Sequence, residues 1–310
     1  MALFFGYQIL SYSFDGVAPD AMFDRVVGLA QAAESAGFDA VTVIDHFENV
    51  IPGREDMPVL EAYTVLPALA ACTRRVHLGA LVTGVTYRNP ALLAKMVTSL
   101  DVISRGRAIL GLGAAWYERE HRSYDFDLPP IGVRMDRLDE ALTICRLMFT
   151  QERASFAGKH HRIDEAINQP RPIQPGGPRI WIGGGGEKRT LRLLARHGDI
   201  GHWSGTLEDL RRKKDVLERH CEAEGRDPNT ILRTVGSPVV LVENEAQARQ
   251  TEERIPPERR AMFQPATVDR AAELLRPYVD AGFQGFTFNN LALPRPESIA
   301  LASELMARLA

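Results

Sequence analysis

Short apolar runs alternate along the chain with longer stretches in which apolar residues recur every three or four positions. The clearest example is 76–116, where an apolar run at 76–82 precedes a helical pattern at 90–104 and a second apolar run at 108–112. An Asn-Pro pair stands where the helical pattern begins, which is typical of a helix start. This stretch is predicted to form a strand, a crossover helix and a second, parallel strand.

The same alternation continues on both sides of this unit. We predict further strands at 4–10, 40–44, 179–182, 201–203, 231–242 and 285–288, and further helices at 19–36, 62–71, 134–149, 187–197, 207–224, 267–281 and 298–309. Eight strand and helix units in 310 residues predict an α/β fold of the (β/α)8 TIM-barrel type, with 1–310 as one domain. An open doubly wound sheet is the alternative.

The segment 151–178 does not fit a simple connection between a helix and a strand. It is long and carries prolines at 170, 172, 175 and 178. We predict a small hairpin around Gly158 followed by an extended stretch, as an insertion after the fourth strand and helix unit. It is interpreted either as a lid over the strand ends or as a disordered excursion.

Composition excludes several classes of protein. The chain is 45% apolar and 25% charged, with a formal net charge of -3, which gives no reason to expect a nucleic acid or an anionic membrane as partner. Cys72, Cys145 and Cys221 lie far apart, each in a predicted helix, so we expect no disulfide and no cysteine metal site. We therefore expect a cytoplasmic protein that is neither exported nor embedded in a membrane.

Polar side chains and glycines follow several of the predicted strands. Asp45 and His46 come directly after the strand at 40–44, and polar segments follow the strands at 76–82 and 108–112. In parallel α/β folds, ligands bind at the carboxyl ends of the strands. A histidine there can exchange a proton near pH 7, and a neighbouring carboxylate can raise its pKa. Adjacent residues on a strand point to opposite faces, however, so a histidine that only caps a helix is the alternative.

Four glycines, residues 183–186, separate the strand at 179–182 from a predicted helix whose first turn carries Lys188 and Arg189. Glycines let main-chain N–H groups approach an anion closely, and a helix N-terminus attracts negative charge. This pattern predicts a phosphate site, with a flexible turn as the alternative. Residues 118–121 are interpreted as a solvated helix start. We expect no metal site, because the eight histidines are dispersed without metal-binding spacing.

Together the Asp-His-Phe motif at 45–47, the TGVTYRNP segment at 83–90, the GLGAAW turn at 111–116 and the glycine run resemble the luciferase-like flavin and deazaflavin oxidoreductases. The branch that uses coenzyme F420 is the most similar. The resemblance implies an Asp-His pair beside the deazaflavin ring and a non-proline cis peptide after the third strand. In the sugar-phosphate dehydrogenases of this family a glutamate near the end of the fourth strand acts as an acid. Ala114 stands at the equivalent place here, which argues against the same substrate and mechanism.

The predicted site follows from these motifs. It comprises Asp45 and His46 as catalytic residues, Asp45, Leu81, Val82, Thr83, Gly84, Gly113, Gly184, Gly185, Gly186 and Lys188 as cofactor-binding residues, and Trp116, Tyr117 and Trp203 as substrate-pocket residues. The expected activity is hydride transfer between F420 and a small organic substrate, in a homodimer. An FMN-dependent luciferase-like monooxygenase and a barrel that binds a cofactor without catalysis are the alternatives.

Overall fold

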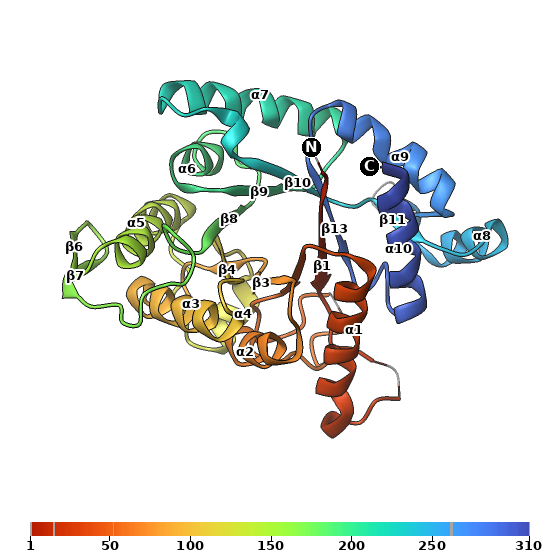
Figure 1. The fold of residues 1–310 in the computed structure, drawn as a ribbon, viewed down its shortest axis with the longest axis horizontal. Coiled ribbons are helices and arrows are strands. Elements are labelled where there is room, and N and C mark those ends of the chain that lie inside the picture. Colours follow the sequence, from red (N-terminus) through yellow and green to blue (C-terminus); the bar gives the residue numbers. More distant parts are fainter. Residues whose placement is uncertain (1, 15, 52, 261–262, 310) are drawn as a thin grey trace.

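The computed structural model describes residues 2–14, 16–51, 53–260 and 263–309. Its centre is a curved sheet of nine parallel strands (Figure 1). In chain order these strands are β1 (Phe4–Ile9), β2 (Ala40–Val43), β3 (His77–Ala80), β4 (Thr83–Gly84), β5 (Ile109–Gly113), β8 (Arg179–Gly183), β9 (Ile200–Trp203), β10 (Leu232–Gly236) and β13 (Gly285–Asn289). Most of them are buried along their length, as expected for strands covered on both faces.

The sheet closes into a barrel with eight positions. Its strand order is β3-β2-β1-β13-β10-β9-β8-β5-β4, so the first strand of the chain pairs with the last. Strands β3 and β4 occupy one position, separated by a non-proline cis peptide bond between Leu81 and Val82. A parallel bridge between Leu78 and Ala108 joins β3 to β5 and completes the circle. The TIM barrel predicted from the sequence is therefore confirmed.

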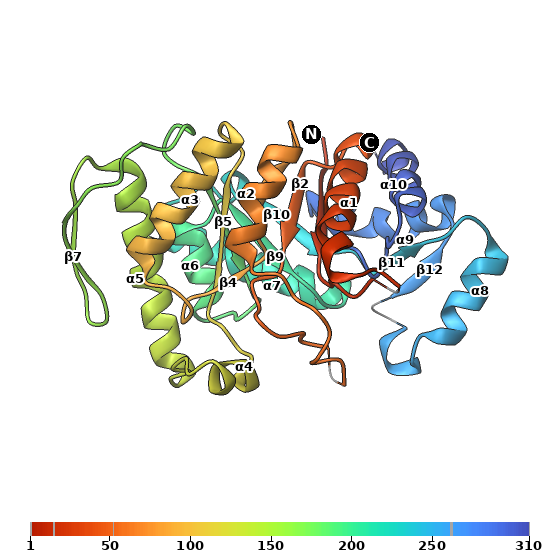
Figure 2. The same ribbon diagram turned by 90° about the horizontal axis from the view of Figure 1, so that it is seen from below.

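Helices surround the barrel (Figures 1 and 2). They are α1 (Met22–Ala36), α2 (Ala62–Cys72), α3 (Pro90–Ser104), α5 (Ile131–Thr150), α6 (Thr190–His197), α7 (Leu207–Ala223), α9 (Val268–Asp280) and α10 (Pro296–Leu309). The start of α3 shows how the sequence sets these boundaries, because the Asn89 side chain accepts hydrogen bonds from the N–H groups of Ala91 and Leu92. Within the described part of the chain, no helix is long and apolar enough to cross a membrane.

Glycine allows two barrel strands to lie unusually close together. A Cβ atom at Gly111 would lie 1.8 Å from the carbonyl oxygen of Ala80, and one at Gly79 would lie 2.5 Å from that of Ile109. No side chain fits at either place without a shift of backbone. These glycines therefore set the approach of β3 to β5, whose carboxyl ends carry part of the predicted site.

The predicted strand at 231–242 is wrong in its length. The barrel strand β10 ends at Gly236, and the chain leaves the barrel to form β11 (Val239–Leu241), which pairs with β12 (Gln264–Ala266) in a separate two-stranded sheet. Pro238 has no N–H group to continue a strand ladder. An additional helix, α8 (Glu245–Arg254), precedes β12 and was not predicted.

The segment 151–178 contains the predicted hairpin, formed by β6 (Ala154–Ala157) and β7 (Arg162–Ala166). Both views place it at the outer edge of the molecule, beside α5 (Figures 1 and 2). The Glu140 side chain of α5 accepts hydrogen bonds from the N–H groups at 159–161 in the hairpin turn. Farther on, Gln174 binds the Asp101 carboxylate of α3. This placement gives no support to a lid, and that role stays a prediction.

Candidate active site

A cavity of about 850 Å³ lies at the carboxyl ends of the barrel strands. The loop after β2 and helix α4 (Glu118–Ser123) lie at this end of the barrel (Figure 2). Small residues leave the space open, since glycine or alanine occupies positions 113–115 after β5 and 183–186 after β8. The cavity is therefore where a TIM-barrel enzyme binds its ligands.

The structure brings most of the predicted site residues to this cavity. Its wall includes His46, Leu81, Val82, Thr83, Gly84, Gly113, Trp116, Gly184, Gly185, Gly186 and Lys188. Three other predicted residues lie elsewhere. Asp45 is buried outside the wall, and Trp203 is buried against Phe283. The Tyr117 ring lies 5.1 Å from that of Trp116 and 6.0 Å from that of His46, centroid to centroid.

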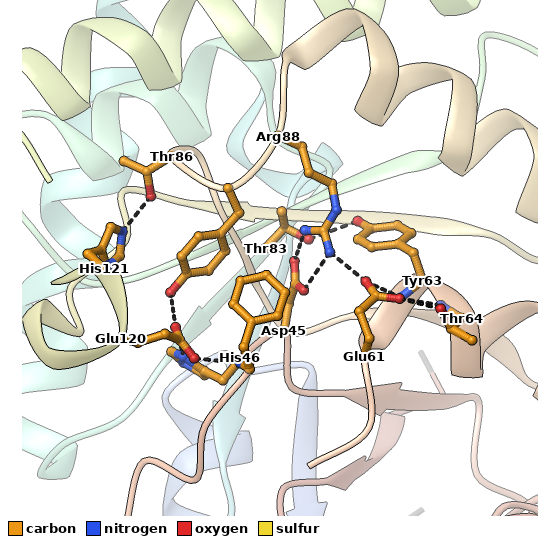
Figure 3. Close-up of polar contacts among 12 residues, drawn as sticks. Asp45, His46, Glu61, Tyr63, Thr64, Thr83, Thr86, Arg88, Glu120 and His121 are labelled. Atoms are coloured by element: carbon orange, nitrogen blue, oxygen red, sulfur yellow. Dashed lines mark hydrogen bonds and ion pairs between the residues drawn. The ribbon is translucent and has the colours of Figure 1, made fainter. Parts of the chain in front are cut away.

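His46 is held by a carboxylate that the sequence did not point to. Its Nδ1 atom lies 2.9 Å from an oxygen of Glu120, on α4 (Figure 3). Because a carboxylate only accepts hydrogen bonds, Nδ1 carries the hydrogen and Nε2 remains for another partner. Ring contacts with Tyr87 and Trp116, at centroid separations of 6.4 and 5.8 Å, fix the imidazole further.

Glu120 is completely buried, and both oxygens of its carboxylate accept hydrogen bonds. Its carboxylate accepts hydrogen bonds from the Tyr87 hydroxyl and from the N–H groups of Phe47 and Glu48, in addition to His46. Burial raises the pKa of Glu120, but the hydrogen bonds from His46 and Tyr87 outweigh it and bring that pKa below its usual value. Glu120 therefore stays ionised at neutral pH and keeps the orientation of His46.

The interpretation of residues 118–121 as a solvated helix start is wrong for two of them. Glu118 is exposed, but Glu120 and His121 are buried. The imidazole of His121 forms hydrogen bonds with the Thr86 hydroxyl and the Tyr117 carbonyl. The sequence around Glu120 is uniformly polar, so only the folding of this helix over the mouth of the barrel reveals its buried face.

Asp45 points away from His46 and forms a separate ion pair. Its two oxygens lie 2.6 and 3.0 Å from the guanidinium of Arg88, which also contacts Glu61 at 2.6 Å (Figure 3). Arg88 lies over the Tyr63 ring, 4.6 Å from its centroid. Burial raises the pKa of Asp45, and Arg88 opposes that effect. This pair anchors the loop after β4 to the end of β2.

The glycine run forms a cradle in front of α6. A Cβ atom at Gly186 would lie 2.8 Å from the Thr190 hydroxyl, and Gly184 has a φ of 104° that favours glycine. A Cβ atom at Gly185 would meet the end of the Lys213 side chain at 2.9 Å. Main-chain N–H groups, a helix N-terminus and the exposed Lys188 together make this corner suitable for an anion.

Val82 lies on the cavity wall between two glycines. Cβ atoms at Gly113 and Gly183 would lie 2.8 and 2.9 Å from its side chain. The cis peptide bond between Leu81 and Val82 directly follows β3, as the resemblance implied. Leu81 and Val82 thus present an apolar surface to the cavity.

His202, from β9, also lines the cavity and was not predicted. The Thr234 hydroxyl donates to the Gly201 carbonyl, so it accepts a hydrogen bond from Nδ1 of His202, at 3.1 Å. Burial lowers the pKa of His202 to about 4. A neutral imidazole therefore faces the cavity at physiological pH.

Two curated proteins are similar to this chain in sequence. The F420-dependent glucose-6-phosphate dehydrogenase of Kineococcus radiotolerans is 34% identical over 230 residues, which cover 72% of this chain and 66% of that protein. The F420-dependent hydroxymycolic acid dehydrogenase of Mycobacterium tuberculosis is 32% identical over 234 residues, which cover 73% of this chain and 61% of that protein. The chain thus spans less than two thirds of the length of either relative.

Solved structures show the same fold. An F420-dependent secondary alcohol dehydrogenase, in complex with an F420-acetone adduct, superposes over the whole of both chains with a TM-score of 0.82 and 18% identity. A long-chain alkane monooxygenase superposes with a TM-score of 0.84 and 15% identity, over 100% of this chain and 91% of that one. At these identities the likeness concerns the fold alone.

The sequence profile described as luciferase-like monooxygenase matches residues 5–307, which is nearly the whole chain. The match includes every barrel strand except the first residue of β1, together with all the residues that line the cavity. The chain belongs to the luciferase-like monooxygenase family.

Proposed function

We propose that this protein is an oxidoreductase that transfers a hydride between coenzyme F420 and a small organic substrate. The observation that carries the proposal is the placement of His46, fixed by the buried Glu120, on the wall of a cavity that also contains the glycine cradle. A proton-transfer group and an anion site thus share one cavity. The F420-dependent dehydrogenases among the relatives support this choice of cofactor.

The residues of the cavity fit such a cofactor. Gly184, Gly185 and Gly186 leave room for a phosphate that side chains would fill, and Lys188 supplies a positive charge. Leu81 and Val82 offer an apolar surface for a flat ring. When bound, the deazaflavin supplies the hydride chemistry, which no side chain of the protein provides.

The contribution of the chain is orientation and proton transfer. As a C–H hydrogen of an alcohol leaves as a hydride, Nε2 of His46 accepts the hydroxyl proton, and a carbonyl compound is formed. In the opposite direction the same atom donates the proton to the carbonyl oxygen. Glu120 keeps the hydrogen on Nδ1 and so leaves Nε2 for this exchange.

Titration of the purified protein with F420 and with FMN, followed by absorption and fluorescence, tests the proposal. We expect F420 to bind more tightly and to be reduced or oxidised by substrate without consumption of oxygen. Tighter binding of FMN, together with oxygen consumption, would identify a flavin monooxygenase instead. Retention of F420 without turnover on any alcohol or carbonyl compound would identify a barrel that only binds the cofactor.

We further propose that the protein is a cytoplasmic homodimer. Its three cysteines are free thiols, which fits a reducing compartment. Sedimentation of the purified chain tests the dimer, and cell fractionation tests the location.

A further inference from the structure

Large apolar side chains lie exposed on the cavity wall. Trp116 lies 5.8 Å from His46, ring centroid to ring centroid, and is 62% exposed. Ile131, at the start of α5, is 56% exposed and lines the same cavity, together with Leu10 and Val50. Large apolar side chains with this exposure beside a proton-transfer group indicate a surface that a ligand covers.

The cationic side chains of the cavity wall lie at the glycine cradle. Among the described residues of its wall, lysine and arginine occur at Lys188 and Arg189, both beside the glycine cradle. Arg189 lies 2.5 Å from the Asp136 carboxylate and 2.9 Å from the Gly132 carbonyl, so its charge is balanced within the protein. Lys188, and the Lys213 ammonium that lies beside Gly185, are left for the cofactor phosphate.

Two other arginines near the cavity donate hydrogen bonds to groups of the protein. Arg88 forms its ion pairs with Asp45 and Glu61. Arg134 donates to the carbonyl oxygens of Ala115 and Pro129, at 2.5 and 2.9 Å. Neither arginine is part of the cavity wall.

The polar side chains near His46 also form their hydrogen bonds within the protein. The Gln8 amide nitrogen donates to the Leu81 carbonyl at 2.9 Å, and the hydroxyls of Thr83 and Tyr63 lie 2.8 Å apart. The Tyr87 hydroxyl donates to Glu120. A substrate rich in hydroxyl groups would find few partners beside His46 to replace its hydration.

Building on the function proposed above, we infer that the substrate is an uncharged and largely apolar carbonyl compound or the corresponding alcohol. Its apolar part contacts Trp116 and Ile131, and its single oxygen meets Nε2 of His46. A proton-transfer group beside a large apolar side chain suits a substrate with one reacting oxygen and an apolar remainder. The same wall disfavours a sugar phosphate.

Ligand binding to the F420-loaded protein tests this inference independently of turnover. We would measure the dissociation constants of 2-butanone, 2-hexanone, 2-octanone and glucose 6-phosphate by calorimetry. Each added methylene group should tighten binding by up to about fourfold, the factor that corresponds to ~0.8 kcal/mol per buried CH₂. Glucose 6-phosphate should bind at least about a hundredfold more weakly than 2-octanone, because the cofactor phosphate already occupies the lysines at the cradle.

Two matched variants locate the contact. Ile131→Ala should weaken the binding of 2-octanone by about fivefold or more, since it removes apolar surface from the wall. Leu92→Ala is the matched control. Leu92 lies on α3 outside the cavity wall, is 55% exposed and has the size of isoleucine, so its replacement should leave the binding of 2-octanone unaltered. Both variants should bind F420 like the wild type.

The possible failures are distinguishable. If F420 itself does not bind, the proposed function fails and this inference falls with it. If F420 binds but the ketones do not, or their affinity is independent of chain length, the apolar substrate is excluded while the cofactor assignment stands. Glucose 6-phosphate binding as tightly as 2-octanone would overturn the inference in the same way.

Discussion

Nδ1 of His46 lies 2.9 Å from the carboxylate of Glu120, a residue 74 positions away in the sequence. The contact joins the end of β2 to the helix that follows β5, across the mouth of the barrel (Figure 3). It fixes both the orientation of the imidazole and the nitrogen that carries the hydrogen. Without Glu120 only the ring contacts would orient the imidazole, and nothing there would select the nitrogen that carries the hydrogen.

Replacement Glu120→Gln should lower kcat by about tenfold or more. The loss should stay below that of removing the general acid or base itself, roughly 10²–10⁴-fold. The amide keeps the shape of the side chain but cannot accept all the hydrogen bonds that the carboxylate accepts. Substrate KM and the F420 dissociation constant should change little, because the lost effect is orientation. The control is Glu118→Gln, which alters an exposed residue of the same helix. An equal effect of both changes would remove the assignment.

Replacement His46→Ala should keep F420 binding within a small factor but reduce single-turnover rates by roughly 10²–10⁴-fold. The physical reason is the loss of the group that exchanges the substrate proton. Fluorescence titration and stopped-flow kinetics on one preparation measure both quantities. A turnover rate near that of the wild type would end the catalytic role of His46.

Replacement Gly185→Ala should weaken F420 binding by about tenfold, which corresponds to ~1.4 kcal/mol. The added methyl group occupies space in the cradle, whereas its protein neighbour is the flexible end of Lys213, so the fold should tolerate the change. Gly28→Ala is the control, since a Cβ atom there meets nothing within 4 Å. Equal F420 affinity in both variants would show that the cradle does not bind the phosphate.

Replacement Arg88→Met should destabilise the fold by about 3–5 kcal/mol, because it leaves the buried Asp45 carboxylate unpaired. The double variant with Asp45→Asn should recover a large part of that loss. Arg119→Met breaks a longer and partly exposed contact with Glu48, at 3.5 Å, and should cost no more than about 1 kcal/mol. Urea unfolding of the four proteins measures these differences, and a similar loss in both single variants would contradict the prediction.

The free energy of unfolding should decrease as the pH is lowered, in a window that His202 partly sets. Its pKa is about 4 in the folded protein and 6.5 ordinarily, so between these values the unfolded chain binds a proton that the folded chain does not. This destabilisation is absent above pH 6.5 and grows as the pH falls. It levels off below pH 4, at up to about 3 kcal/mol. His202→Gln should lose less stability than the wild type between pH 7 and 4.5 in urea unfolding. Parallel curves for the two proteins would exclude this titration.

The barrel was predictable because the information for it is local. Apolar runs and helical periodicity mark each strand and helix in turn, and right-handed crossovers leave few ways to arrange eight such units. The prediction of one strand at 231–242 was wrong because apolar residues lie on both sides of Pro238, although the chain leaves the barrel there. Pattern alone does not tell a barrel strand from a short strand in a separate sheet.

The sequence by itself determined which residues follow the strand ends, and therefore that His46, the cis peptide segment and the glycine run meet at one cavity. Only the tertiary structure decided their partners. Alternation along a strand predicts that Asp45 and His46 diverge, but not that Arg88 holds one and Glu120 the other. Such contacts depend on how loops cross the mouth of the closed barrel, and no local pattern in a polar loop encodes which of its side chains becomes buried.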